Sequence, residues 1–163
     1  MKQSFILFSC ALILLAVGCG EKRPDGLPPL HPTALTFTQG GVPLAGASVT
    51  LTPMDATNSQ WALGGATDSK GVLNVQTQGF KGAPAGNYKV SVLKTETEGT
   101  PAAASIDPDA PAPPDTSKQF HLVDAKYRSL GTTDLTLEVK AGKNAQTFEL
   151  GAAVREEIPV YRN

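Results

Sequence analysis

Apolar and polar residues alternate with a period of two through much of the chain between residues 34 and 150. The alternating runs are rich in Val, Thr, Phe and Tyr and are bounded by Gly, Pro, Asn or Asp, which is typical of β-strands that bury one face. No window of ten residues or more has the pattern of a capped amphipathic helix. The pattern therefore predicts an all-β fold, a single seven-stranded antiparallel β-sandwich. The expected strands are residues 34–38, 47–52, 72–76, 88–92, 135–139 and 146–150, with a weaker one at 61–67.

One face of each expected strand carries the apolar side chains, which predicts the residues of the core. Burial of each such side chain contributes about 1.5–3 kcal/mol, so the set makes an ordinary core for one domain. The expected core residues are Leu35, Phe37, Val49, Leu51, Val75, Tyr88, Val90, Val92, Leu135, Leu137, Val139, Phe148 and Leu150.

The N-terminal segment has a different pattern, with Lys2 followed by an uncharged apolar run over residues 5–17. This run is shorter than the roughly 20 residues of a membrane-spanning helix, and it has the layout of an export signal. The residues LAVGC at 15–19 resemble the lipobox of bacterial lipoproteins. The resemblance implies cleavage before Cys19 and acylation of Cys19, which is the expected lipidation site. An ordinary signal peptide and a buried helix that carries Cys19 are the alternatives.

These features divide the chain into four parts. Residues 1–18 are expected to be a lipoprotein signal peptide, and residues 19–33 the acylated cysteine with a flexible, Pro-rich tether. The sandwich follows over residues 34–150, and residues 151–163 form a C-terminal tail. Residues 95–119 are rich in Pro and Ala and interrupt the strand pattern, which predicts a mobile excursion or an inserted linker.

Removal of the signal peptide changes the cysteine count and the charge. Cys19 becomes the only cysteine, and acylation uses its thiol, so we expect no disulfide. Loss of Lys2 leaves 13 basic and 15 acidic side chains, a net charge of −2. This balance does not favour binding to a polyanion, and we expect no nucleic-acid partner.

Three short motifs occur in order along the expected sandwich: GVPLAGASV at residues 41–49, ATDSKG at 66–71 and PAGNYKVSV at 84–92. Together they resemble the carboxypeptidase regulatory-like, transthyretin-like β-sandwich domains of bacterial lipoproteins, of the type abundant in planctomycetes. The resemblance implies a transthyretin-like fold that serves as a structural or binding module. Turn formation by the glycines and by Asp68 explains the same motifs without a ligand.

Side chains suited to catalysis are few. A zinc peptidase site needs a His-x-x-Glu pair and another histidine, whereas neither His31 nor His121 has a glutamate three residues later. The transthyretin-like 5-hydroxyisourate hydrolases use histidines and an arginine, and His121 and Arg128 would serve in that alternative. Ser48 and Ser91 have no evident His or Asp partner for nucleophilic catalysis. We therefore expect no enzymatic activity, no cofactor and no metal.

Three further features have a binding interpretation beside a structural one. Asp107, Asp109 and Asp115 offer oxygen ligands for calcium, but the intervening prolines favour a solvated acidic loop. Asp68 is a turn former or a ligand. Trp61 stacks on a sugar or packs in the core. In each case the structural interpretation is favoured.

We expect, from these observations, a lipid-anchored, extracytoplasmic, non-enzymatic interaction or structural module of the bacterial cell envelope. Its partners are the membrane, through the lipid anchor, and either an envelope protein at an exposed sheet edge or a polysaccharide. A 5-hydroxyisourate hydrolase-like enzyme, a carbohydrate-binding surface module and a passive spacer are the alternatives. Gly20 and Glu21 lack the Asp that often retains lipoproteins at an inner membrane, which slightly favours the outer membrane.

Overall fold

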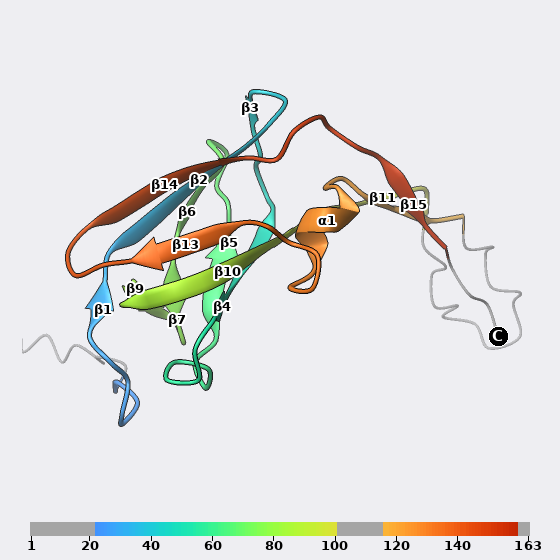
Figure 1. Cartoon of the computed structure of the whole chain (residues 1–163). Coiled ribbons are helices and arrows are strands. Elements are labelled where there is room, and N and C mark those ends of the chain that lie inside the picture. Colours follow the sequence, from blue (N-terminus) through green and yellow to red (C-terminus); the bar gives the residue numbers. More distant parts are fainter. Residues whose placement is uncertain (1–21, 101–115, 160–163) are drawn as a thin grey trace, which may run out of the picture.

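Strands dominate the computed structural model of the chain, which describes residues 22–100 and 116–159 (Figure 1). This part of the chain contains fifteen strands and one short helix, α1 (Ala125–Arg128), so the expected all-β class is confirmed. The strands are β1 (Leu30–His31), β2 (Thr33–Gln39), β3 (Val42–Pro43), β4 (Ser48–Pro53), β5 (Leu63–Ala66), β6 (Val72–Asn74), β7 (Gln76–Thr77), β8 (Phe80–Lys81), β9 (Ala83–Pro84), β10 (Gly86–Leu93), β11 (Thr95–Glu98), β12 (Lys118–His121), β13 (Thr136–Val139), β14 (Asn144–Glu149) and β15 (Glu156–Ile158).

Two larger sheets enclose the core. One has the strand order β13-β10-β4-β5-β7-β8, and the other has the order β14-β2-β3, with β6 also paired to β2. Their inward side chains form one cluster, in which the rings of Phe37 and Phe148 stack with their centroids 5.3 Å apart. Twelve of the thirteen expected core residues are buried, and Leu135 is half-buried. Alternation along the strands therefore identified the inward faces correctly.

The arrangement of the strands differs from a single seven-stranded antiparallel sandwich. The described strands form four sheets, because a β1–β9 pair and a β11-β12-β15 sheet stand beside the two larger ones. In addition, β2 and β14 pair in parallel, from Thr33 opposite Asn144 to Thr38 opposite Glu149, whereas the other described pairs are antiparallel. Alternation determines which side chains face inward, but it does not determine the direction of the neighbouring strand.

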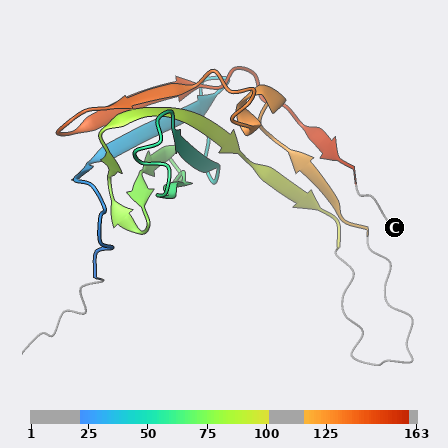
Figure 2. The same cartoon turned by 60° about the horizontal axis from the view of Figure 1, so that its bottom comes forward.

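The Pro/Ala-rich segment begins and ends in strands, which differs from an excursion over the whole of residues 95–119. β11 pairs with β12, and β12 pairs with β15 from the expected C-terminal tail. These three strands, called the arm below, project away from the two larger sheets, as Figure 2 shows. Phe120 of β12 is buried, and the Arg155 guanidinium lies 3.5 Å from its ring centroid. Residues 101–115 lie outside the described part of the chain.

The end of the expected tether packs on the domain. Leu27 is buried, and β1 pairs with β9 through Leu30 and His31. The expected signal peptide and Cys19 lie outside the described residues. Within residues 22–100 and 116–159, no helix combines the length and the apolar composition needed to span a membrane.

Candidate functional site

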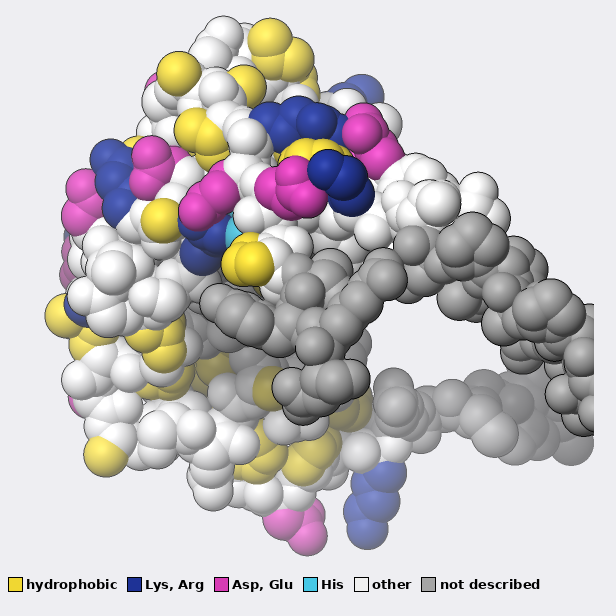
Figure 3. Space-filling view, turned by 90° about the vertical axis from the view of Figure 1, so that its right-hand side faces the viewer, with side chains coloured by type: hydrophobic (Ala, Val, Ile, Leu, Met, Phe, Trp, Pro, Cys, Tyr) yellow, Lys and Arg dark blue, Asp and Glu magenta, His cyan; other side chains and the backbone are white. Residues whose placement is uncertain are grey.

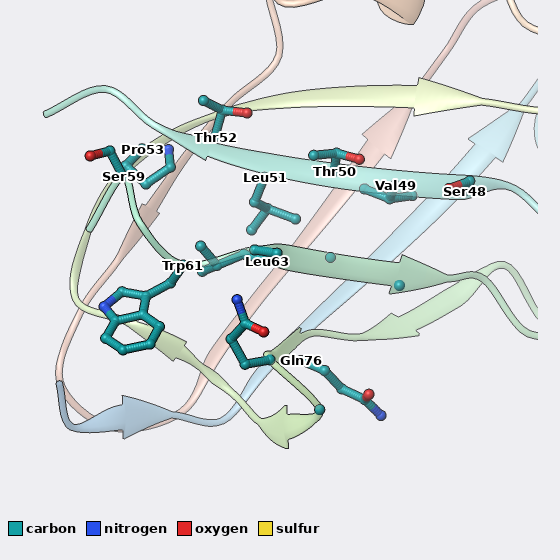
Figure 4. Close-up of a pocket in the computed structure, with 15 residues that line it drawn as sticks. Ser48, Val49, Thr50, Leu51, Thr52, Pro53, Ser59, Trp61, Leu63 and Gln76 are labelled. Carbon is teal, nitrogen blue, oxygen red and sulfur yellow. The ribbon is translucent and has the colours of Figure 1, made fainter. Parts of the chain in front are cut away.

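An open groove of about 490 Å³ lies on the outer face of the six-stranded sheet, over β4, β5 and β7 (Figure 4). We call it the outer groove. Figure 4 shows Trp61 at one end of it and Ser48 at the other. Its described lining residues are Ser48, Val49, Thr50, Leu51, Thr52, Pro53, Ser59, Trp61, Ala62, Leu63, Gly64, Gly65, Gln76, Gln78 and Gly79.

The alternation of β4 supplies one wall of the outer groove. Val49 and Leu51 are buried in the core, so the intervening Thr50 projects to the outer face, where it is exposed. Antiparallel register then places Thr50 opposite Gly64 of β5, and Gly64 opposite Gln76 of β7. One row across the three strands therefore carries a hydroxyl group at Thr50, no side chain at Gly64 and a side-chain amide at Gln76.

Glycines keep the floor of the outer groove free of side chains. Gly64 and Gly65 have φ angles of +150° and +152°, a region that L side chains rarely adopt. A Cβ at Gly64 would lie 2.1 Å from the carbonyl oxygen of Val49, and a Cβ at Gly65 would lie 2.8 Å from Cδ1 of Leu73. The backbone of β4 thus requires glycine at position 64, which leaves the groove floor bare there. Gly65 lies opposite the buried Val49, so its Cβ would enter the core at Leu73 and would not fill the groove.

Two side chains line the groove near its Trp61 end. The indole of Trp61 is half-buried and packs against the core, while its Nε1 is buried without a hydrogen-bond partner among the described residues. In Figure 4 this nitrogen lies on the side of the ring that is turned away from Gln76. Gln78 has a left-handed backbone, with φ of 51°, and its N–H donates to the carbonyl of Ala62 at 3.1 Å. Gln78 and Gly79 form the two-residue loop between β7 and β8, and positive φ at both positions is typical of the tight turn of such a hairpin.

The chemistry of the outer groove is uncharged. Its described lining residues offer hydroxyl groups, two side-chain amides, backbone groups and one indole, and none of them is Asp, Glu, Lys, Arg or His. These groups form neutral hydrogen bonds and apolar contacts. They include no side chain suited to general acid–base catalysis near neutral pH.

The two histidines of the chain lie in separate places, and only His121 was expected to serve in a hydrolase, together with Arg128. His31, in β1, accepts a hydrogen bond from the Gly142 N–H to its Nδ1 at 3.2 Å. His121 belongs to the arm, at the opposite end of the molecule (Figure 1). Strand register places His121 opposite Glu156, whose carboxylate forms an ion pair with Arg128. His121 and Arg128 therefore share Glu156 as a neighbour, whereas His31 lies apart from them.

Charged residues of both signs gather around the arm, on the face shown in Figure 3. Lys118 pairs with Glu157 at 3.2 Å, and Arg155 pairs with Glu98. The Nδ1 of His121 is buried and has no hydrogen-bond partner among the described residues. Groups of three or more His, Cys, Asp or Glu side chains that suit a metal ion do not occur in the described ranges.

The remaining candidates have structural positions or lie outside the described chain. Asp68 accepts hydrogen bonds from the N–H groups of Lys70 at 2.8 Å and Val72 at 2.9 Å, and these bonds lower the pKa of its carboxyl. Asp68 therefore forms the turn before β6. Ser91 lies opposite Thr50 in the β10–β4 pair. The three aspartates considered for calcium fall within residues 101–115, which the structure does not describe.

Sequence reasoning considered Trp61 and Ser48 but missed Gln76, Gln78 and the two glycines of the groove floor. Two features of the sequence could have indicated the groove. Gly64 and Gly65 lie inside a run otherwise suited to a strand, and the polar positions of the preceding strand are all Ser or Thr. No family model matches this chain, and the comparisons with curated proteins and with solved structures find no match either.

Proposed function

We propose that this protein is a lipid-anchored extracytoplasmic β-sandwich protein that acts as a non-enzymatic interaction module of the bacterial cell envelope. The observation that carries the proposal is the outer groove, an open and uncharged surface of hydroxyl and amide groups on a two-sheet body. Such a surface supplies hydrogen bonds and apolar contact to a ligand, and lacks the ionisable side chains that chemistry on that ligand requires.

A transthyretin-like sandwich is the fold that we propose for the body. Two layers of the described strands support it: β5-β4-β10-β13 in one sheet, and β6, β2 and β14 in the other. Each of the three sequence motifs also lies at a turn or at the start of a strand. Residues 41–49 lead through β3 into β4, residues 66–71 connect β5 to β6, and residues 84–92 lead into β10.

The proposed anchor holds the domain near the membrane. Leu27 is the first buried apolar residue of the described chain, and seven residues separate it from Cys19. The eight residue steps from Cys19 to Leu27 reach at most about 26–29 Å when fully extended. A partner of this module is therefore another component of the envelope surface, within a short distance of the lipid.

A hydrolase of the 5-hydroxyisourate type is the second candidate. The arm favours it through one observation: Glu156 lies opposite His121 in the β12–β15 pair and forms an ion pair with Arg128. The test is direct: the purified full-length protein is assayed for 5-hydroxyisourate hydrolysis beside its His121→Ala and Arg128→Ala variants. Turnover by the wild type that both variants lose would establish this candidate, and absence of turnover would remove it.

The anchor is tested in the bacterial host with labelled palmitate and membrane fractionation. We expect the wild type to carry the label and to sediment with membranes. Cys19→Ala should lose both properties, and the matched control Cys10→Ala should keep both, because Cys10 lies within the expected signal peptide. A Cys19→Ala protein that stays labelled and membrane-bound would contradict the proposal.

The interaction role is tested by crosslinking in intact cells, followed by mass spectrometry. We expect a reproducible envelope partner with the wild type and its loss with Cys19→Ala. Thr50→Arg places a long charged side chain over the floor of the outer groove without altering a core position, so a crosslink that this variant loses is one formed at the groove. Absence of any specific partner from the wild type would contradict an interaction role and favour a spacer.

A further inference from the structure

We propose that the outer groove binds a neutral oligosaccharide, seated across β4, β5 and β7 with Trp61 at one end. The inference rests on the proposed function as an interaction module and names the chemical class of the ligand. The chemistry of the lining residues, the pairing of the strands beneath them and the dimensions of the groove favour this class of ligand.

The charge of the lining favours a neutral ligand. The described lining residues carry no formal charge, so an anionic or cationic ligand would lose its hydration without gaining an ion pair from the lining. The nearest charged side chains on neighbouring strands are Lys81, opposite Gln76, and Lys89, opposite Thr52. Thr50, Gln76 and Gln78 carry hydroxyl and amide groups that both donate and accept hydrogen bonds. The hydroxyl groups of a neutral sugar also donate and accept, so the two surfaces match each other.

Strand pairing disfavours an extended peptide as the occupant. A peptide that adds to a sheet needs an edge with unpaired N–H and C=O groups. At the groove, β4 lies between β10 and β5, and β5 lies between β4 and β7, so the backbone is already paired on both sides from Ser48 to Leu51 in β4 and at Leu63 and Gly64 in β5. A ligand must therefore bind through side chains and the sheet face.

The dimensions of the groove favour several sugar units. Outward side chains along β4 from Ser48 to Thr52 cover four residue steps, or about 13 Å at 3.3 Å per residue. This length exceeds one sugar ring. The volume of about 490 Å³ is in the range of established ligand sites, which is about 300–1,000 Å³.

Trp61 supplies an apolar surface at the end of this row. Its polar edge is turned away from Gln76, so the carbon surface of the indole is nearer to the groove (Figure 4). Aromatic side chains pack well against apolar faces of a ligand while polar neighbours set its orientation. Packing against the core also fixes the position of the ring, which lowers the entropic cost of binding.

The test uses the full-length lipidated protein, purified in a detergent without a sugar headgroup. Trp61 is the single tryptophan of the chain, so intrinsic fluorescence reports directly on the groove. The probes are maltohexaose, cellohexaose and chitohexaose, with hexagalacturonate as an anionic control of equal length. We expect at least one neutral hexasaccharide to give a saturable change in fluorescence below about 10 mM, and no saturable change with hexagalacturonate.

Three variants assign the binding to the groove, with isothermal titration calorimetry as the readout. Thr50→Arg should reduce affinity by tenfold or more, because its side chain covers the glycine floor. Gln76→Ala removes one amide partner and should reduce affinity about five- to tenfold. Gln119→Ala is the matched control, since it removes an exposed amide from the arm, and it should leave affinity unchanged.

The outcomes separate this inference from the proposed function. Failure of all three neutral probes to bind would overturn the inference, as would equal binding of hexagalacturonate or an unchanged affinity of the Thr50→Arg variant. A crosslinked envelope protein recovered from cells would still support an interaction module in that event. Binding of a neutral hexasaccharide that Thr50→Arg abolishes supports the inference.

Discussion

Replacement of Gly64 by alanine is the most direct test of how the outer groove is built. The added Cβ would lie 2.1 Å from the carbonyl oxygen of Val49, well inside the contact distance of the two atoms. The obstacle is backbone, so no side-chain rotation can relieve the overlap. β4 and β5 must move apart where Thr50 lies opposite Gly64, at the centre of the six-stranded sheet.

The expected loss of stability has two sources. A φ of +150° is strained for alanine and costs about 1–3 kcal/mol. Separation of the strands weakens two or so ladder hydrogen bonds, at about 1 kcal/mol each. We therefore expect the free energy of unfolding to fall by about 3–5 kcal/mol, a large part of the 5–15 kcal/mol that is typical of one domain.

Urea unfolding measures this loss. With a denaturant dependence of about 2 kcal/mol per molar, the midpoint for Gly64→Ala should fall by about 2 M. Gly142→Ala is the control, because Gly142 also has a positive φ, +100°, but has nothing within 4 Å of an added Cβ. If Gly64→Ala lowers the midpoint no more than Gly142→Ala does, steric contact with β4 is not the reason for glycine in the groove floor.

Two further predictions concern hydrogen bonds that hold turns to strands. Thr67→Val should lower the free energy of unfolding by about 2–4 kcal/mol. The reason is that the buried Thr67 hydroxyl accepts a hydrogen bond from the Ala47 N–H at 2.9 Å and donates one to the Leu44 carbonyl at 2.6 Å. A urea midpoint equal to that of the wild type would contradict this prediction. The Glu149 carboxylate accepts from the Thr38 hydroxyl at 2.6 Å and the Gly40 N–H at 2.8 Å, and these bonds lower its pKa from 4.5. A lowered pKa in the folded state means that the stabilisation is complete above pH 4.5 and disappears as the pH falls through the folded value. The difference in urea midpoint between the wild type and Glu149→Gln should therefore be largest at pH 7 and shrink at pH 3, and a difference independent of pH would contradict the assignment.

The longer strands of the two sheets and the core were predictable from the sequence, because each depends on local alternation. The short strands β1, β3, β8 and β9 and the three strands of the arm were not expected. The seven expected runs all contain or overlap strands, although the run at 72–76 is divided between β6 and β7 at Val75. Strand neighbours were not predictable, since pairing depends on contacts between residues far apart in the chain. The parallel alignment of β2 with β14 and the recruitment of β15 to the arm are both of this kind.

The groove was only partly predictable, because it is defined by a row across three strands. Thr50, Gly64 and Gln76 come together through the register of β4, β5 and β7, and none of the three is distinctive by itself. Trp61 attracted attention as the only tryptophan, but the sequence does not indicate whether its ring faces the core or a surface. In the structure the Trp61 ring packs against the core and also lines the outer groove.

The parallel pair of β2 and β14 has a consequence for the order of folding. The Thr38 hydroxyl contacts the Phe148 carbonyl across 110 positions of sequence, so the central strand of one sheet is completed only when nearly the whole domain is present. Pairing over such separations slows folding. A chain synthesised from its N-terminus would therefore stay without its final sheet until β14 has been made, and a chain truncated before residue 144 would lack the neighbour that covers one side of β2.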